Sequence, residues 1–116
     1  MTDIRIAFMG QGKDLNEFSS DLFETDSFGE GTKKDIPGGT ITMLPMTVEK
    51  SAEISRVIEV VLSVGRDVSV GVVAAYIYEK LRAQPRGSIH MMIKRREVHQ
   101  NQSEITKVIE EIIEIQ

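Results

Sequence analysis

Two histidines, His90 and His99, are the residues of this sequence best suited to acid–base or metal chemistry. Glu97 lies between them and could complete a set of three metal ligands if the segment turned back on itself. However, the pair lacks the i, i+4 spacing on one helix that zinc peptidases use, and no cluster of Asp and His joins it. We therefore expect His90 to be a half-exposed strand residue and His99 a loop residue, with no metal and no other cofactor bound.

The turn Gly10-Gln11-Gly12-Lys13 lies between an expected strand and an expected helix, where phosphate-binding loops occur. A P-loop needs four residues between its glycines and a Ser or Thr after the lysine, but here one residue separates the glycines and Asp14 follows the lysine. The dinucleotide-binding pattern also fails, because Leu15 stands where its third glycine is required. Asp14 would in addition repel a phosphate at the helix N-terminus. The residues favour an ordinary strand-to-helix turn.

A catalytic nucleophile has little support. The sequence contains no cysteine, which excludes disulfides, thiolate metal ligands and cysteine nucleophiles, and which fits a reducing cytoplasm. No strained nucleophile motif marks a serine. We therefore assign no catalytic residue and favour a protein that is not an enzyme, although a site assembled from distant residues stays open as the alternative.

Basic residues near the end of an expected helix and in an expected hairpin are the strongest polar feature of the chain. They are Arg82, Arg86, Lys94, Arg95 and Arg96. If the fold brings them together, they could bind an anionic partner such as phosphate, RNA or an acidic protein tail. The alternative is a solvated turn, favoured by cations near a helix C-terminus. The formal net charge of -4 and the absence of interleaved aromatic residues argue against nucleic acid.

The long apolar tract of residues 51–81 sets the centre of the expected fold. With 116 residues, 41% hydrophobic and 28% charged, the chain is expected to form a single domain over residues 1–116. The segment 57–78 is long enough to cross a membrane, but Glu59, Arg66 and Asp67 would each cost about 2.5 kcal/mol in hydrocarbon. We therefore expect buried helices rather than a membrane span. Asp3 and a short apolar run also argue against an export signal, so we expect a cytoplasmic protein.

Periodicity predicts the elements that must position these residues. In chain order they are a strand at 4–9, a helix at 14–24, a loop at 26–39, a strand at 40–46, helices at 51–64 and 68–82, a strand at 88–94, a short strand around Val98 and a helix from 101 onward. Helix is chosen for 51–64 because its polar positions recur at intervals of three and four. The expected caps are Asp14 with Glu17, Asp67, and Asn101 with Glu104.

This order, β-α-β-α-α-β-(β)-α, predicts an α+β fold in which helices cover a small mixed sheet of three to four strands. The helix at 68–82 is apolar nearly all round, so we expect it to be packed on every side. Gly71 and Ala75, four residues apart, form a small stripe where another backbone could come close.

Isoleucines give the last helix an apolar surface that is wider than one narrow seam. We expect most of it to be core, with part forming an oligomer interface. The candidate interface residues are Ile105, Ile109, Ile112 and Ile113.

Several segments, taken in order, carry a resemblance to a known family. They are Pro37-Gly38-Gly39, Leu62-Ser63-Val64-Gly65, the helix end at 76–82, the strand at 88–93 and the amphipathic C-terminal helix. In this arrangement the chain resembles the effector-associated constant component proteins of bacterial conflict systems. The resemblance implies a small non-catalytic component encoded beside variable effectors such as peptidases, and it carries over no catalytic residue.

Two classes of function remain. The first is a cytoplasmic interaction or scaffold module that self-associates, binds an effector protein, or does both, without a membrane or nucleic acid. The alternative is a small enzyme or ligand-binding domain that uses the Gly10–Lys13 turn, the 26–39 loop and the histidines. The first class is favoured because the polar residues show no convergent acid–base or ligand spacing.

Overall fold

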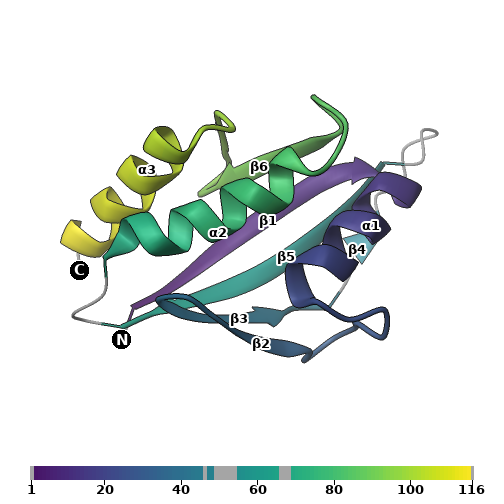
Figure 1. Ribbon diagram of the computed structural model, residues 1–116, viewed down its shortest axis with the longest axis horizontal. Helices are drawn as coiled ribbons and strands as arrows, with labels where there is room; N and C mark the ends of the chain where they lie inside the picture. Colours follow the sequence, from purple (N-terminus) through teal and green to yellow (C-terminus); the bar gives the residue numbers. More distant parts are fainter. Residues whose placement is uncertain (1, 46, 49–54, 66–68, 116) are drawn as a thin grey trace.

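Two ten-residue antiparallel strands, β1 (Thr2–Gln11) and β5 (Ser55–Val64), run through the centre of the structure (Figure 1). The computed structural model describes residues 2–45, 47–48, 55–65 and 69–115. The remaining elements are α1 (Gly12–Phe23), β2 (Lys33–Ile36), β3 (Gly39–Met43), β4 (Thr47–Val48), α2 (Val70–Arg82), β6 (Ile89–Ile93), β7 (Arg96–Val98) and α3 (Gln102–Ile115).

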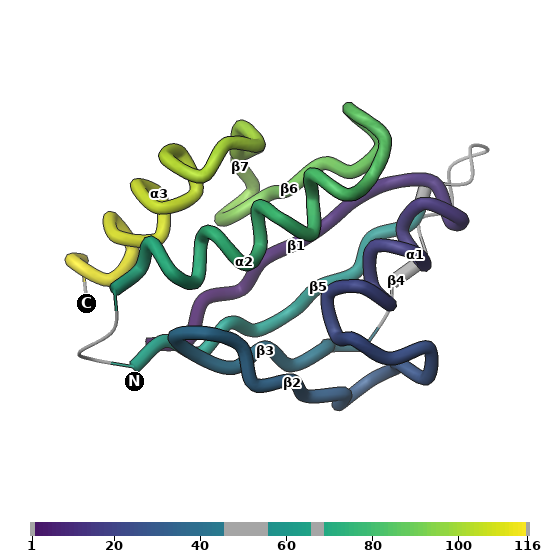
Figure 2. The backbone as a smooth tube through the Cα atoms, viewed as in Figure 1, coloured from purple at the N-terminus to yellow at the C-terminus, as the bar shows by residue number. Residues whose placement is uncertain are grey.

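All strands belong to one antiparallel sheet with the order β2-β3-β5-β1-β6-β7, and β4 pairs with β5 beside β3. Helix α1 lies near one end of the sheet, while α2 and α3 lie side by side toward the other (Figure 2). The predicted α+β class is therefore confirmed. The predicted sheet was wrong in two respects, since it has seven strands in the described ranges rather than three or four, and every pair is antiparallel rather than mixed.

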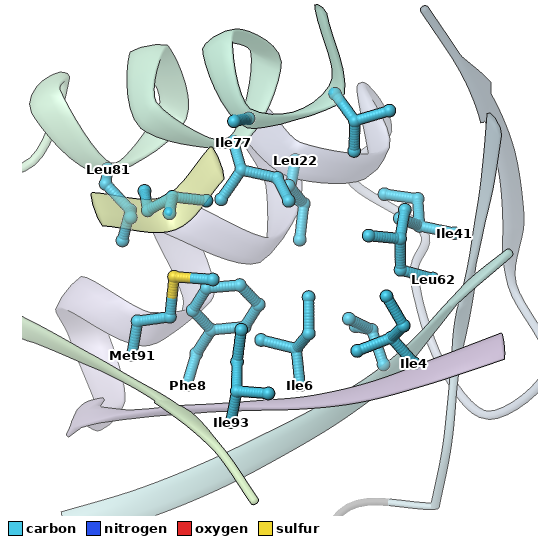
Figure 3. Close-up of a cluster of buried hydrophobic side chains, with 14 of the residues drawn as sticks. Ile4, Ile6, Phe8, Leu22, Ile41, Leu62, Ile77, Leu81, Met91 and Ile93 are labelled. Carbon is cyan, nitrogen blue, oxygen red and sulfur yellow. The ribbon is translucent and has the colours of Figure 1, made fainter. Parts of the chain in front are cut away.

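The core lies between one face of the sheet and the three helices (Figure 3). Alternate residues of the long strands β1 and β5 and of β6 point into it, and those of β1 are Ile4, Ile6 and Phe8. From the helices, Leu22, Ile77 and Leu81 close over them. The ring centroids of Phe8 and Phe18 lie 4.7 Å apart in a tilted arrangement, and this contact joins α1 to β1.

The predicted helix at 51–64 was wrong, because residues 55–64 form the central strand β5. Residues 51–54 lie outside the described residues. Burial alternates over residues 57–64, with Ile58, Val60 and Leu62 in the core and Val57, Glu59 and Val61 half-buried on the opposite face. Both faces carry apolar residues, so hydrophobicity alone shows no period of two. The β-branched composition of this segment was the better signal, since valine and isoleucine fit a pleated, half-buried surface.

The loop expected at 26–39 contains a strand, β2, which forms a hairpin with β3. Pro37 and Gly38 make the turn, and Gly38 has φ of 88°, which a glycine adopts without steric cost. Gly39 then begins β3 against β5, where a Cβ would come within 2.2 Å of the carbonyl oxygen of Ser63. The strand expected at 40–46 is confirmed as β3 but ends at Met43.

Of the three expected helix caps, one is confirmed, one is wrong and one lies outside the described residues. Asn101 caps α3, because its Oδ1 accepts a 2.7 Å hydrogen bond from the backbone N–H of Glu104. The prediction for α1 was wrong: Gln11 is its N-cap residue without a side-chain hydrogen bond, and Asp14 lies in the first turn. The predicted cap Asp67 lies outside the described residues.

Helix α2 begins at Val70 and ends at Arg82, close to the predicted bounds, but it is not packed on every side. Val72 is 46% exposed. A Cβ on Gly71 would meet only the hydroxyl of Ser69, at 3.6 Å, so the Gly71/Ala75 stripe is not a close backbone contact within the described part of the chain. No helix among the described residues is long and apolar enough to cross a membrane.

Candidate functional site

The five candidate cations lie at two opposite ends of β6 rather than in one cluster. Arg82 and Arg86 precede the strand. Lys94 and Arg95 form the turn that follows it, and Arg96 begins β7 opposite Ile93. A five-residue strand is about 17 Å long. The fold therefore makes two separate basic sites, and a single anionic partner would have to span both.

The first site is a pocket between the end of α2, the loop that follows it and the β6–β7 hairpin. Here it is called the hairpin pocket, and it encloses about 580 Å³. Residues that line it include Tyr78, Arg82, Gln84, Arg86, His90, Glu97 and His99. The two histidines and two of the predicted cations thus share one pocket, which their sequence separation did not indicate.

His90 and Glu97 form a close polar contact in the hairpin pocket. His90 Nδ1 lies 2.7 Å from Glu97 Oε1, with both side chains more than half exposed. The contact follows from the hairpin register, because Met92 pairs with Glu97 and His90 lies two residues from Met92 on the same face. The carboxylate orients the imidazole ring through Nδ1 and leaves Nε2 for another partner.

Two further contacts shape the wall of this pocket. The guanidinium of Arg82 lies over the ring of Tyr78, with 5.9 Å between Cζ and the ring centroid. Gln84 is only 8% exposed, and its Nε2 donates a long hydrogen bond of 3.4 Å to Asp21 Oδ2. Its Oε1 is buried and has no hydrogen-bond partner among the described residues. Among the residues that the structure describes, no group of three His, Cys, Asp or Glu side chains could hold a metal ion.

The second site is the face of the sheet that points away from the helices, here called the open face. Half-buried apolar side chains form its middle, and they are Ala7, Met9, Val57, Val61 and Met92. No described element covers them. A groove of about 640 Å³ runs along this face and is bordered by Lys94 and Arg95.

Charged residues of both signs surround the apolar middle of the open face. Arg5 Nε lies 2.6 Å from Glu59 Oε2, and Ser63 Oγ donates a 2.7 Å hydrogen bond to Asp3 Oδ1. Because both contacts join β1 to β5, they add cross-strand support at the centre of the sheet.

Lys94 and Arg95 occupy an unusual turn at the edge of the open face. Ile93 pairs with Arg96, so the hairpin loop has two residues, and both have positive φ, 52° for Lys94 and 64° for Arg95. Two-residue loops of this kind favour Asn-Gly or Asp-Gly, because a Cβ is strained at positive φ. The turn therefore holds two cations in a backbone conformation that neither prefers.

The Gly10–Lys13 turn makes close structural contacts. A Cβ on Gly10 would come within 2.7 Å of the Ser88 carbonyl oxygen, so this glycine allows β1 and the start of β6 to approach. The Arg56 side chain lies beside Gly12, at 3.5 Å from the position of a Cβ there. The 26–39 loop starts at the opposite end of α1, about 18 Å away along a 12-residue helix. The turn and the loop therefore do not combine into one site.

The 26–39 loop is held by ordinary structural contacts. Lys34 Nζ lies 2.5 Å from Glu24 Oε2, and this hydrogen bond and charge lower the pKa of Glu24 below its usual 4.5. The backbone N–H of Gly31 donates to Met43 O.

Tyr76 joins α2 to α1. Its hydroxyl donates a 2.7 Å hydrogen bond to Leu22 O, and burial, with a smaller contribution from the Glu24 charge, raises the pKa of Tyr76 to about 12. The phenol therefore remains a neutral donor, which suits a structural link between helices.

The four candidate interface isoleucines of α3 divide by burial. Ile105 and Ile109 are fully buried and Ile112 is 6% exposed, so these three belong to the core, and Ile112 also lines the groove of the open face. Ile113 is half-buried against the core. Ile115, which was not among the candidates, is 77% exposed.

The open face does not follow from the sequence prediction, because the segment of β5 was predicted to be helical. The alternation of Ala7 and Met9 with the core residues of β1, and of Met92 with those of β6, are signals that point to this face.

Comparison of the chain with family models, curated proteins and solved structures finds no match, so the resemblance to effector-associated constant components stays a prediction.

Proposed function

We propose that this protein is a non-catalytic interaction module that self-associates through the open face of its sheet. The observation that carries the proposal is the apolar middle of that face, formed by β1, β5 and β6 and left uncovered by the described elements. A sheet commonly buries its second apolar face against another layer, and a second copy of the chain can supply that layer.

The size of the open face supports this occupant. With a rise of about 3.4 Å per residue and about 4.8 Å between strands, one face of the six strands β2, β3, β5, β1, β6 and β7 has an area of roughly 600 Å². Two copies would together bury about 1,200 Å², the lower end of the range for stable interfaces.

The charges support the same occupant. The open face carries Asp3 and Asp35 as well as Lys33 and Arg5, as the strand register shows. In a two-fold dimer each patch meets a copy of itself, so a surface with both signs can complement itself.

The edges of the sheet favour association through the face rather than along the strands. Edge strand β2 begins Lys33-Lys34-Asp35, and edge strand β7 is the three-residue segment Arg96–Val98. Short, charged edge strands discourage pairing with another sheet. An edge-to-edge dimer is therefore disfavoured.

We further propose that the module acts in the bacterial cytoplasm as a scaffold accessory to a separately encoded effector. This part rests on the resemblance of the sequence segments described above, together with the absence of cysteine. No catalytic role is proposed for any residue.

Sedimentation velocity tests self-association. The chain is measured from about 1 μM to about 1 mM, which spans association free energies of about −8 to −4 kcal/mol. We expect a dimer that Met9→Glu with Met92→Glu converts to a folded monomer, because the two carboxylates would be desolvated in the interface. Val72→Glu, an exposed apolar position on α2, is the matched control and leaves the dimer intact.

Two results would contradict the proposal. A wild-type chain that stays monomeric over the whole range would exclude the second copy as occupant. A dimer that survives the Met9/Met92 variant but is lost in Val72→Glu would move the interface to the helical layer.

A further inference from the structure

We propose that the hairpin pocket binds the phosphate group of a small molecule. Its volume of about 580 Å³ lies within the range of about 300–1,000 Å³ that is usual for small-ligand pockets. The pocket adjoins the open face, because His90 pairs with Met9 and Glu97 pairs with Met92. Its two arginines come instead from the end of α2 and the loop that follows, so changing them tests phosphate binding separately from self-association.

The donors that line the pocket suit a phosphate. Arg82 and Arg86 supply two guanidinium groups, which match phosphate oxygens in charge and in forked geometry. The contact with Tyr78 holds Arg82 in place before a ligand arrives. His90 and His99 add imidazole nitrogens on the hairpin side of the same pocket.

Negative groups near the pocket are already engaged. Oε1 of Glu97 contacts Nδ1 of His90. The helix-end carbonyl oxygens of Glu79 and Leu81 accept hydrogen bonds from the backbone N–H groups of Ala83 and Gln84. These pairings reduce the repulsion that an incoming phosphate would meet, and the two arginines outweigh the one carboxylate of Glu97.

The inferred ligand class is therefore a free phosphate or a small phosphate monoester, held by the two guanidinium groups.

A titration of the ¹⁵N-labelled full chain followed by amide chemical shifts tests the site. The probes are inorganic phosphate and glycerol 3-phosphate, added at constant ionic strength against sodium chloride. We expect saturable shifts with both probes, confined to residues 78–90 and 97–100. Arg82→Gln with Arg86→Gln should weaken binding at least tenfold, since a hydrogen bond to a charged group contributes about 1.5–3 kcal/mol.

The controls separate a built site from general attraction to cations. Lys94→Gln with Arg95→Gln removes the same charge at the other end of β6 and should leave both dissociation constants unchanged. The proposal is overturned if neither probe gives saturable shifts, or if the Lys94/Arg95 variant weakens binding as much as the Arg82/Arg86 variant.

Discussion

Replacing the strained β6–β7 turn should make the protein more stable. Lys94 and Arg95 both have positive φ, which costs a residue with a Cβ about 1–2 kcal/mol. In Lys94→Asn with Arg95→Gly, asparagine tolerates this conformation and glycine adopts it without steric cost, as in the favoured two-residue hairpin loops. The added freedom of glycine in the unfolded chain offsets about 0.4–1 kcal/mol of the gain.

The net gain in the free energy of unfolding should be about 1–2 kcal/mol. For a domain of this length, 1 kcal/mol raises the Tm by roughly 3–6 °C. Urea unfolding followed by circular dichroism measures the gain, and calorimetry measures the Tm. The slope of the free energy against urea should not change, because the same surface is exposed on unfolding.

Two control variants separate backbone strain from charge. Lys94→Gln with Arg95→Gln removes both cations but keeps two residues with Cβ atoms at positive φ, so its stability should stay near that of the wild type. Arg96→Gly places glycine at the first position of β7 and should destabilise by about 0.5–1 kcal/mol. If the glutamine variant gains as much as the Asn-Gly variant, charge repulsion rather than strain is relieved and the reasoning is refuted.

Three further changes test the fold. Gly39→Ala should lower the free energy of unfolding in urea by at least about 2 kcal/mol, because its Cβ would overlap the Ser63 carbonyl oxygen. Gly29→Ala is the control and should be nearly neutral, since its Cβ meets nothing within 4 Å. Equal effects of the two changes would contradict the close approach of β3 and β5. Asn101→Ala should lower the free energy of unfolding by about 1 kcal/mol, because α3 loses its N-cap hydrogen bond. Ser103→Ala is the control. An unchanged urea midpoint in Asn101→Ala would show that the cap does not stabilise the fold. Tyr76→Phe should flatten the alkaline stability profile. The pKa of Tyr76 is raised to about 12 in the fold, above the usual tyrosine value of 10.0, so the wild type keeps this contribution below pH 10 and loses it toward pH 12. Parallel profiles of the two proteins between these pH values would show that the phenol does not titrate as inferred.

The elements with one clear apolar face were predictable from the sequence. Ile89, Met91 and Ile93 alternate with polar or half-exposed neighbours, and they form β6 with the expected residues in the core. The last helix was equally clear, since its isoleucines recur at helical spacing behind an Asn101 cap. Such segments show their period because one side meets water.

The central strand β5 was not predictable in this way. Its two faces both carry valine, one packed under the helices and the other on the open face, so no period of two is visible in hydrophobicity. A prediction of helix for residues 55–64 excludes both the long antiparallel pairing of β5 with β1 and the open face that this pairing forms. The β2 strand was hidden for a different reason, because its Lys33-Lys34-Asp35 sequence has the polarity of an exposed edge.

By itself, the sequence determined the α+β class, the presence of the three helices and the absence of cysteine chemistry, because these depend on local periodicity and on composition. Only the tertiary structure decided which polar residues meet. It placed Arg82 and Arg86 in one pocket with His90, and Lys94 and Arg95 at the opposite end of β6. The physical reason is that strand pairing joins residues far apart in the chain, and the register of β6 between β1 and β7 sets these neighbours.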